Sequence, residues 1–107
     1  MRDDRVKGHL DGLLLAVLEP EPLHGYAVIE ALQQQSGGTL SLPTGTVYPA
    51  LRRLEQAGWI RGSWSTVGGR RRRTYSLTSS GHHELAGERA AWTSFSNSVN
   101  QVFGGAS

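Results

Sequence analysis

A single amphipathic segment, residues 42–58, constrains what this chain can fold into more than any other part. Apolar side chains recur along it at the three- and four-residue spacing of one helix face, and Gly58 follows as a residue suited to a left-handed helix end. The segment therefore predicts a helix with one face in a core. That face holds Val47, Ala50, Leu51, Leu54 and Ala57.

The opposite face of this helix is polar, at a turn of about 100° per residue. Pro49 conflicts with a regular helix there, because an interior proline removes one backbone hydrogen bond and costs about 3 kcal/mol. We therefore expect a kinked first turn. The polar face carries Thr46, Pro49, Arg52, Arg53 and Gln56, with Tyr48 and Glu55 at one edge.

This polar face has the chemistry of a helix that reads a major groove. Arginine forks onto guanine, glutamine pairs with adenine, and hydroxyl groups near a helix start hold phosphate. We expect Arg52 and Gln56 to touch base edges. The alternative is a solvated face with two ordinary arginines, and the helix alone does not decide between them. The remaining contacts expected on this surface are Tyr26, Thr44, Thr46, Tyr48, Pro49 and Arg53.

The charge of the chain is concentrated in its middle third. The 107 residues carry a net charge of only +2, but seven of the eleven Lys and Arg residues fall between Arg52 and Arg73. That concentration indicates an anionic partner. The length fits one domain with a small core, which often gains stability by association. The absence of cysteine excludes disulfides. Residues 1–7 are polar, and no apolar run approaches the ~18 residues of a membrane span. The sequence therefore predicts a soluble, cytoplasmic protein without a membrane partner.

Two further helices are expected before the amphipathic segment. The first spans residues ~9–19, where Pro20 and Pro22 stop the helical spacing, and we assign it to the core and to dimer contact. The second spans residues 25–35 and ends at Gly37-Gly38. The second helix and the amphipathic segment that follows it form a helix-turn-helix arrangement. The apolar residues of the first helix are Leu10, Leu13, Leu14, Val17 and Leu18.

Residues 59–66 and 72–77 predict a β-hairpin with a turn at residues 67–70. Ile60, Gly62 and Trp64 share one face, as do Tyr75 and Leu77, so one side of the hairpin is apolar and is expected to lie on the helices. The basic tip, a wing, would contact phosphates or a minor groove; the alternative is a tip that only solubilises the protein. The tip arginines are Arg70, Arg71, Arg72 and Arg73.

The last helix is expected from Thr78-Ser79-Ser80 to about Phe103, where Gly104-Gly105 ends it. Its apolar residues form a coiled-coil-like seam, broken only by Glu88. About 26 residues make a rod of roughly 39 Å, so a second chain is expected to cover the seam; the alternative is that the seam folds back onto its own domain. The seam residues are Leu85, Trp92, Phe95, Val99 and Val102.

Four motifs in register resemble the PadR family of winged-helix transcriptional regulators. They are His24-Gly25-Tyr26, the run from Thr44 to Glu55 followed by Gly58-Trp59-Ile60, the run from Arg71 to Thr78, and Gly81, and the similarity covers roughly residues 8–103. The resemblance implies operator binding, repression and release by a small effector. It also implies a short branch of the family with a single C-terminal helix.

The sequence thus predicts a mainly α fold with a small β-hairpin. Residues 1–77 form a winged helix-turn-helix, and residues 78–107 form a dimerisation helix and tail. The expected function is a sequence-specific repressor that acts as a homodimer on an inverted repeat. A winged-helix protein-interaction module is the alternative. An enzyme is not expected, nor a metal or cofactor, because the four histidines are scattered: His9, His24, His82 and His83.

Trp92 lies at a core position of the C-terminal seam, where it approaches its own copy in a symmetric dimer. It is then either close-packed dimer core or one wall of a cavity for a planar apolar molecule. The resemblance favours the cavity, because drug-sensing PadR-like regulators stack ligands on a tryptophan at the matching position. We therefore expect a flat aromatic effector between Trp92, Phe95 and Val99, with Leu14 and Leu18 as further walls.

Overall fold

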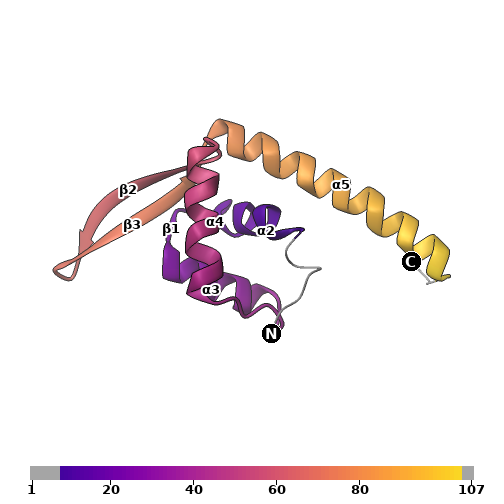
Figure 1. The fold of residues 1–107 in the computed structure, drawn as a ribbon, viewed down its shortest axis with the longest axis horizontal. Helices are drawn as coiled ribbons and strands as arrows, with labels where there is room; N and C mark the ends of the chain where they lie inside the picture. Colours follow the sequence, from indigo (N-terminus) through magenta and orange to yellow (C-terminus); the bar gives the residue numbers. More distant parts are fainter. Residues whose placement is uncertain (1–7, 105–107) are drawn as a thin grey trace.

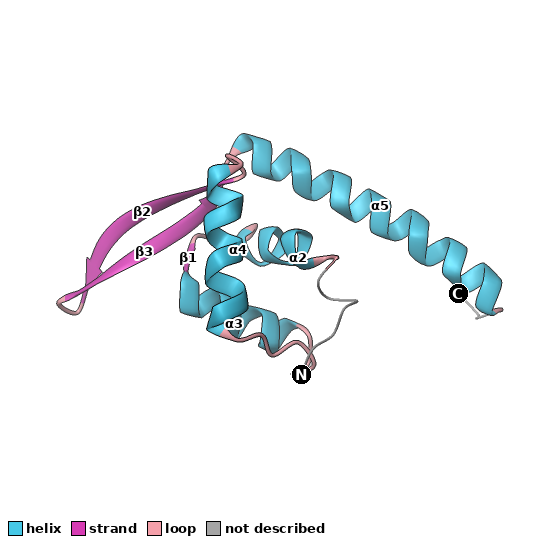
Figure 2. Ribbon diagram, viewed as in Figure 1, coloured by secondary structure: helices cyan, strands magenta, loops and turns pink. Residues whose placement is uncertain are grey.

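The computed structural model describes residues 8–104 of the chain, so the polar start at residues 1–7 and Gly105 lie outside the described residues. Within these residues the chain forms four helices and a small sheet, arranged as in Figures 1 and 2, which confirms the predicted mainly α class with a β-hairpin. The elements are α2 (Leu10–Leu18), β1 (Leu23–His24), α3 (Gly25–Gln35), α4 (Thr44–Gln56), β2 (Ile60–Val67), β3 (Arg70–Leu77) and α5 (Ser79–Phe103).

The sheet has three antiparallel strands in the order β1-β3-β2. β1 was not predicted: Leu23 and His24 pair with Tyr75 and Thr74 of β3. The predicted turn at residues 67–70 is also too long, because Val67 and Arg70 still pair and only Gly68 and Gly69 form the turn. Both glycines have positive φ, 59° and 78°, the conformation that a tight two-residue hairpin turn requires.

Side-chain caps fix the starts of α3 and α5. The Nδ1 atom of His24 accepts a hydrogen bond from the backbone N–H of Ala27 at 3.4 Å, so this histidine caps α3. The hydroxyl of Thr78 accepts from the N–H of Gly81 at 3.0 Å and caps α5, which ends at Gly104 in the left-handed conformation. α4 runs without a break through Pro49, and the predicted kink stays a prediction.

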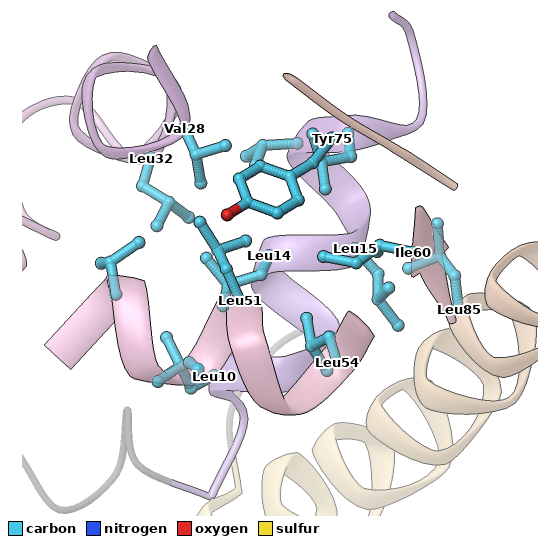
Figure 3. Packing of buried hydrophobic residues seen from close by; sticks show 14 residues of the cluster. Leu10, Leu14, Leu15, Val28, Leu32, Leu51, Leu54, Ile60, Tyr75 and Leu85 are labelled. Carbon is cyan, nitrogen blue, oxygen red and sulfur yellow. The ribbon is translucent and has the colours of Figure 1, made fainter. Parts of the chain in front are cut away.

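One apolar cluster joins α2, α3, α4 and the sheet (Figure 3). Leu14 and Leu15 of α2 are fully buried at its centre, with Leu51 of α4. Leu85 is the apolar side chain of α5 that enters this cluster. Beyond it α5 leaves the winged-helix region, which gives the described part of the chain its elongated shape of 55 × 30 × 21 Å (Figure 1).

None of the helices formed by residues 8–104 combines the length and the apolar character needed to cross a bilayer.

Candidate nucleic-acid interface and effector groove

α4 presents an exposed surface that the core leaves uncovered. Val47, Ala50, Leu51 and Leu54 are buried. Arg52 lies on the opposite side and, within residues 8–104, no carboxylate forms an ion pair with it. This exposed face of α4 is called the reading face below. Its exposed residues are Thr44, Thr46, Pro49, Arg52 and Gln56.

Two ion pairs border the reading face. On one side Arg53 donates a hydrogen bond to the carboxylate of Asp11 in α2; on the other, Arg73 of β3 donates to the carboxylate of Glu55. Arg53 was expected to point outward with Arg52; instead it turns to the edge, because Asp11 lies within reach. The two pairs connect α4 to α2 and to the hairpin.

Tyr48 lies where α4 crosses the start of α3. Its ring is half-buried against Gly25: a Cβ atom at residue 25 would lie 2.2 Å from Cε1 of Tyr48. The motif glycine is therefore there because only a residue without a side chain lets the ring approach. Tyr26, the next residue, remains exposed.

Burial raises the pKa of Tyr75, which is part of the core, and the negative charge of Glu55 raises it further.

The four consecutive arginines do not gather at the tip of the hairpin, contrary to the prediction. They run along β3, where alternate residues point to opposite faces. The register pairs Trp64 with Arg73 and Thr66 with Arg71, so these four side chains share one face, while Arg70 and Arg72 lie on the other. Hydrogen bonding to Glu55 raises the pKa of Arg73 and anchors its guanidinium at the edge of α4.

Trp64 is the residue of this surface that sequence reasoning misplaced. It was assigned to the apolar side that covers the helices, but 57% of its surface is exposed. Its side chain lies beyond the edge of the core, with the Cζ atoms of Arg71 and Arg73 at 4.6 and 5.3 Å from the ring centroid. The sequence did contain a signal for this exposure. In the hairpin Trp64 lies directly across from Arg73 and shares its face with Arg71, so that face is basic at this point.

α5 is tied to α2 by the guanidinium of Arg89, which donates two hydrogen bonds to the carboxylate of Glu19, at 2.9 and 3.1 Å. These bonds lower the pKa of Glu19 and raise that of Arg89. After Arg89, α5 carries large apolar side chains that are exposed to solvent. They are Trp92, Phe95, Val102 and Phe103.

An open groove of about 580 Å³ lies between α2 and α5, and its lining includes Leu13, Ala16, Glu88 and Trp92. The ring of His9 meets Trp92 edge-on, with the centroids 5.1 Å apart. Leu14 and Leu18 were predicted to form walls of the effector site, but both are buried in the core. Leu13 and Ala16 of α2 line the groove instead.

Part of the predicted dimer contact must also be corrected. Leu10, Leu14, Val17 and Leu85 are at most 8% exposed, because they belong to the core of their own protomer. These side chains offer no surface to a second chain.

Among residues 8–104, no group of three His, Cys, Asp or Glu side chains is placed to hold a metal ion.

The sequence profile described as "Transcriptional regulator PadR-like family" matches residues 14–87. The fold is similar to that of a PadR family transcriptional regulator from Eggerthella lenta, with 29% identity, a TM-score of 0.83, and 94% of this chain and 86% of that one covered. A PadR-like transcriptional regulator from Bacillus cereus matches at 26% identity and a TM-score of 0.84, over 97% and 100% of the two chains. A transcriptional regulator from Clostridium thermocellum shares the fold, with 22% identity, a TM-score of 0.86, and 92% and 97% covered.

Proposed function

Because this chain belongs to the PadR-like family of transcriptional regulators, we propose that it is a repressor that binds an inverted-repeat operator as a homodimer and is released by a flat aromatic effector. It acts in the cytoplasm and is not an enzyme. Residues 1–77 bind DNA, and residues 78–107 hold the dimer together. The observation that carries the proposal is the reading face of α4, exposed and bordered by an ion pair on each side.

In the proposed complex the reading face lies in the major groove. Arg52 and Gln56 contact base edges, and a bidentate arginine contact of this kind contributes ~1–3 kcal/mol of discrimination between bases. Thr44, Thr46 and Tyr48 hold the phosphate backbone, as does Tyr26 of α3. The wing arginines add affinity with little sequence preference, because phosphates are the same at every step.

The dimer is proposed to form through α5. Phe95 and Val102 are 58% and 84% exposed, and the stripe that they form with Trp92 and Val99 lies on one side of the helix. A soluble monomer rarely leaves such a stripe uncovered. A two-fold dimer then imposes an inverted repeat, with half-site centres about one helical turn apart or a multiple of it.

The effector is proposed to enter the groove between α2 and α5. About 580 Å³ lies within the range of volumes that hold small molecules, and the lining is mainly apolar. Trp92 offers a flat ring for stacking, with Phe95 at 6.2 Å between centroids. In the dimer, Phe95 and Val99 lie farther along the same helix, next to the partner.

The DNA proposal is tested by selecting duplexes from a random library with the wild-type protein, Arg52→Ala and Arg53→Ala. Arg53 is the matched control, because it is the neighbouring arginine and its guanidinium is already taken by Asp11. We expect the wild type to enrich an inverted repeat, Arg52→Ala to lose preference at one base per half-site, and Arg53→Ala to keep it. If both variants enrich the same strict motif as the wild type, Arg52 does not read bases.

The dimer is tested by sedimentation of the wild type, Phe95→Glu and Asn97→Glu. Phe95 belongs to the apolar stripe, whereas Asn97 lies on the opposite side of α5 and is exposed. The wild type and Asn97→Glu should sediment as dimers, and Phe95→Glu as a monomer. A wild-type monomer at tens of micromolar would refute the assembly.

The effector site is tested with flat aromatic compounds and a variant in which Trp59 and Trp64 are changed to Phe, so that Trp92 alone emits. Saturable quenching that also weakens operator binding supports the site. Absence of quenching, together with two indoles packed in contact in the dimer, makes Trp92 purely structural.

A further inference from the structure

The hairpin β2–β3, the wing, is basic without compensation from its own residues. Residues 60–77 contain five arginines and no aspartate or glutamate. Within the described chain, the carboxylate that pairs with one of them comes from Glu55 in α4. A surface with this balance of charge attracts a polyanion and disfavours an ordinary apolar protein partner. The exposed Trp64 in the middle of this basic surface is therefore best explained by a contact with nucleic acid.

Trp64 sits on the face of the wing that continues the reading face. Arg73 links the two surfaces. It lies on the same face of the wing as Trp64, and its guanidinium donates a hydrogen bond to Glu55 at the edge of α4. Along the protein surface, the order is thus Arg52, the Glu55–Arg73 pair, Trp64 and then Arg71. DNA that covers Arg52 and the outer part of the wing must pass Trp64.

The position of Trp64 along the wing decides what its ring can reach. Trp64 pairs with Arg73, three residues back from the pair Val67 and Arg70 that closes on the turn. At about 3.3 Å per residue the ring lies roughly 10 Å behind the tip. A B-DNA minor groove is about 7.5 Å deep and about 6 Å wide. A tip made of Gly68 and Gly69, which carry no side chains, can enter it, and Trp64 then lies at the groove's rim and not between bases.

We propose that the indole of Trp64 is itself a DNA contact that packs against the deoxyribose wall at the rim of the minor groove, held in place by the guanidinium groups of Arg71 and Arg73. This inference rests on the proposed DNA-binding function. The sugar offers C–H groups to the apolar ring face. Arg71, stacked on the ring at 4.6 Å, is aimed at the adjacent phosphate.

A contact by the ring differs measurably from a contact by an arginine. A phosphate contact releases counterions, so its loss flattens the slope of log affinity against log salt by about 0.9 units. Loss of apolar packing lowers affinity at every salt concentration and leaves the slope as it was. Affinity and slope together therefore separate a ring that touches DNA from a ring that only orients Arg71.

The experiment uses a random-sequence 30-base-pair duplex and the full chain as wild type, Trp64→Ala, Trp64→Phe, Arg71→Gln and Ser63→Ala. Ser63 is the control, because it is exposed on the opposite face of the same strand. We expect Trp64→Ala to bind roughly tenfold more weakly with an unchanged salt slope. Trp64→Phe should recover most of the loss, Ser63→Ala should match the wild type, and Arg71→Gln should flatten the slope. Thermal unfolding verifies that each variant is folded.

A second readout follows the ring directly, in a variant with Trp59 and Trp92 changed to Phe. Duplex binding should protect the emission of Trp64 from acrylamide quenching. If the wild type binds DNA but Trp64 stays as accessible as before, or if Trp64→Ala flattens the slope like Arg71→Gln, the inference is overturned and the proposed function stands. If the wild type shows no salt-dependent DNA binding, the proposed function itself fails.

Discussion

Gly81 offers the sharpest test of how α5 is attached to the winged helix. It is buried in the first turn of α5, and a Cβ atom there would lie 1.9 Å from the carbonyl oxygen of Trp59. Ordinary contact begins at 3.4 Å, so the Gly81→Ala change forces a shift of about 1.5 Å. The obstacle is backbone, which cannot rotate away. The same carbonyl accepts a hydrogen bond from the N–H of Thr78, so the junction would be disturbed as a whole.

The expected cost follows from these contacts. Overpacking in a closed site costs about 1–3 kcal/mol and occasionally more. Weakening the cap between the Thr78 hydroxyl and the N–H of Gly81 adds about 1 kcal/mol. We expect Gly81→Ala to lower the free energy of unfolding by about 3 kcal/mol. In a domain of this size that corresponds to a fall in Tm of at least about 10 °C.

Gly87 is the matched control, because it lies in the same helix and receives the same change. A Cβ atom at residue 87 would meet nothing within 4 Å. Gly87→Ala should therefore stabilise the protein by about 0.8–1 kcal/mol, through helix propensity alone. Urea unfolding of both variants and the wild type measures the two effects, at one protein concentration because the proposed dimer would make stability depend on concentration. Equal stability of Gly81→Ala and the wild type, or a loss with Gly87→Ala, would refute the reasoning.

Three more predictions concern α2, α3 and α4. Gly25→Ala should displace the ring of Tyr48 and destabilise the protein by about 1–3 kcal/mol, and adding Tyr48→Ala should cost less than the sum of the two changes in a double-mutant cycle. The pKa of Glu19 lies below its ordinary 4.5 because Arg89 donates to it; the stabilisation is thus present above that value and lost as the pH falls through the lower, folded pKa. The Tm of Glu19→Gln should accordingly be below that of the wild type at pH 7 and converge with it in acid. Pro49→Ala should raise Tm, because it restores a backbone hydrogen bond in α4; an unchanged or lower Tm would show that the proline is favoured by its rigidity.

Helix positions and the core of this fold follow from local periodicity, and they were predictable. The helix of residues 25–35 and the threonine cap of α5 depend on neighbours in the sequence. β1 was missed because the two residues between Pro22 and Gly25 form a strand only by pairing with β3, about 50 residues later. The partners of Arg53 and Arg73 lie 42 and 18 residues away, so no local pattern assigns them.

The surface of α2 shows a related limit. Periodicity identified its apolar residues, but it did not say which of them face the core and which line the groove. Leu14 is fully buried while Leu13 lines the groove, although they are adjacent. That division depends on where α5 crosses α2, and the Arg89–Glu19 contact that ties the crossing joins residues 70 positions apart.

Thr78 alone separates the last strand of the wing from α5. Its hydroxyl binds both the carbonyl of Gly58, at 2.6 Å, and the N–H of Gly81, so the joint is a stiff elbow and not a hinge. α5 is therefore a rigid arm: 25 residues at 1.5 Å per residue give about 37 Å, so a sideways movement of about 3 Å at its far end turns the winged-helix region with it by only about 5°. In the proposed dimer, a coarse rearrangement among the C-terminal helices would thus become a fine adjustment in the angle between the two winged-helix regions.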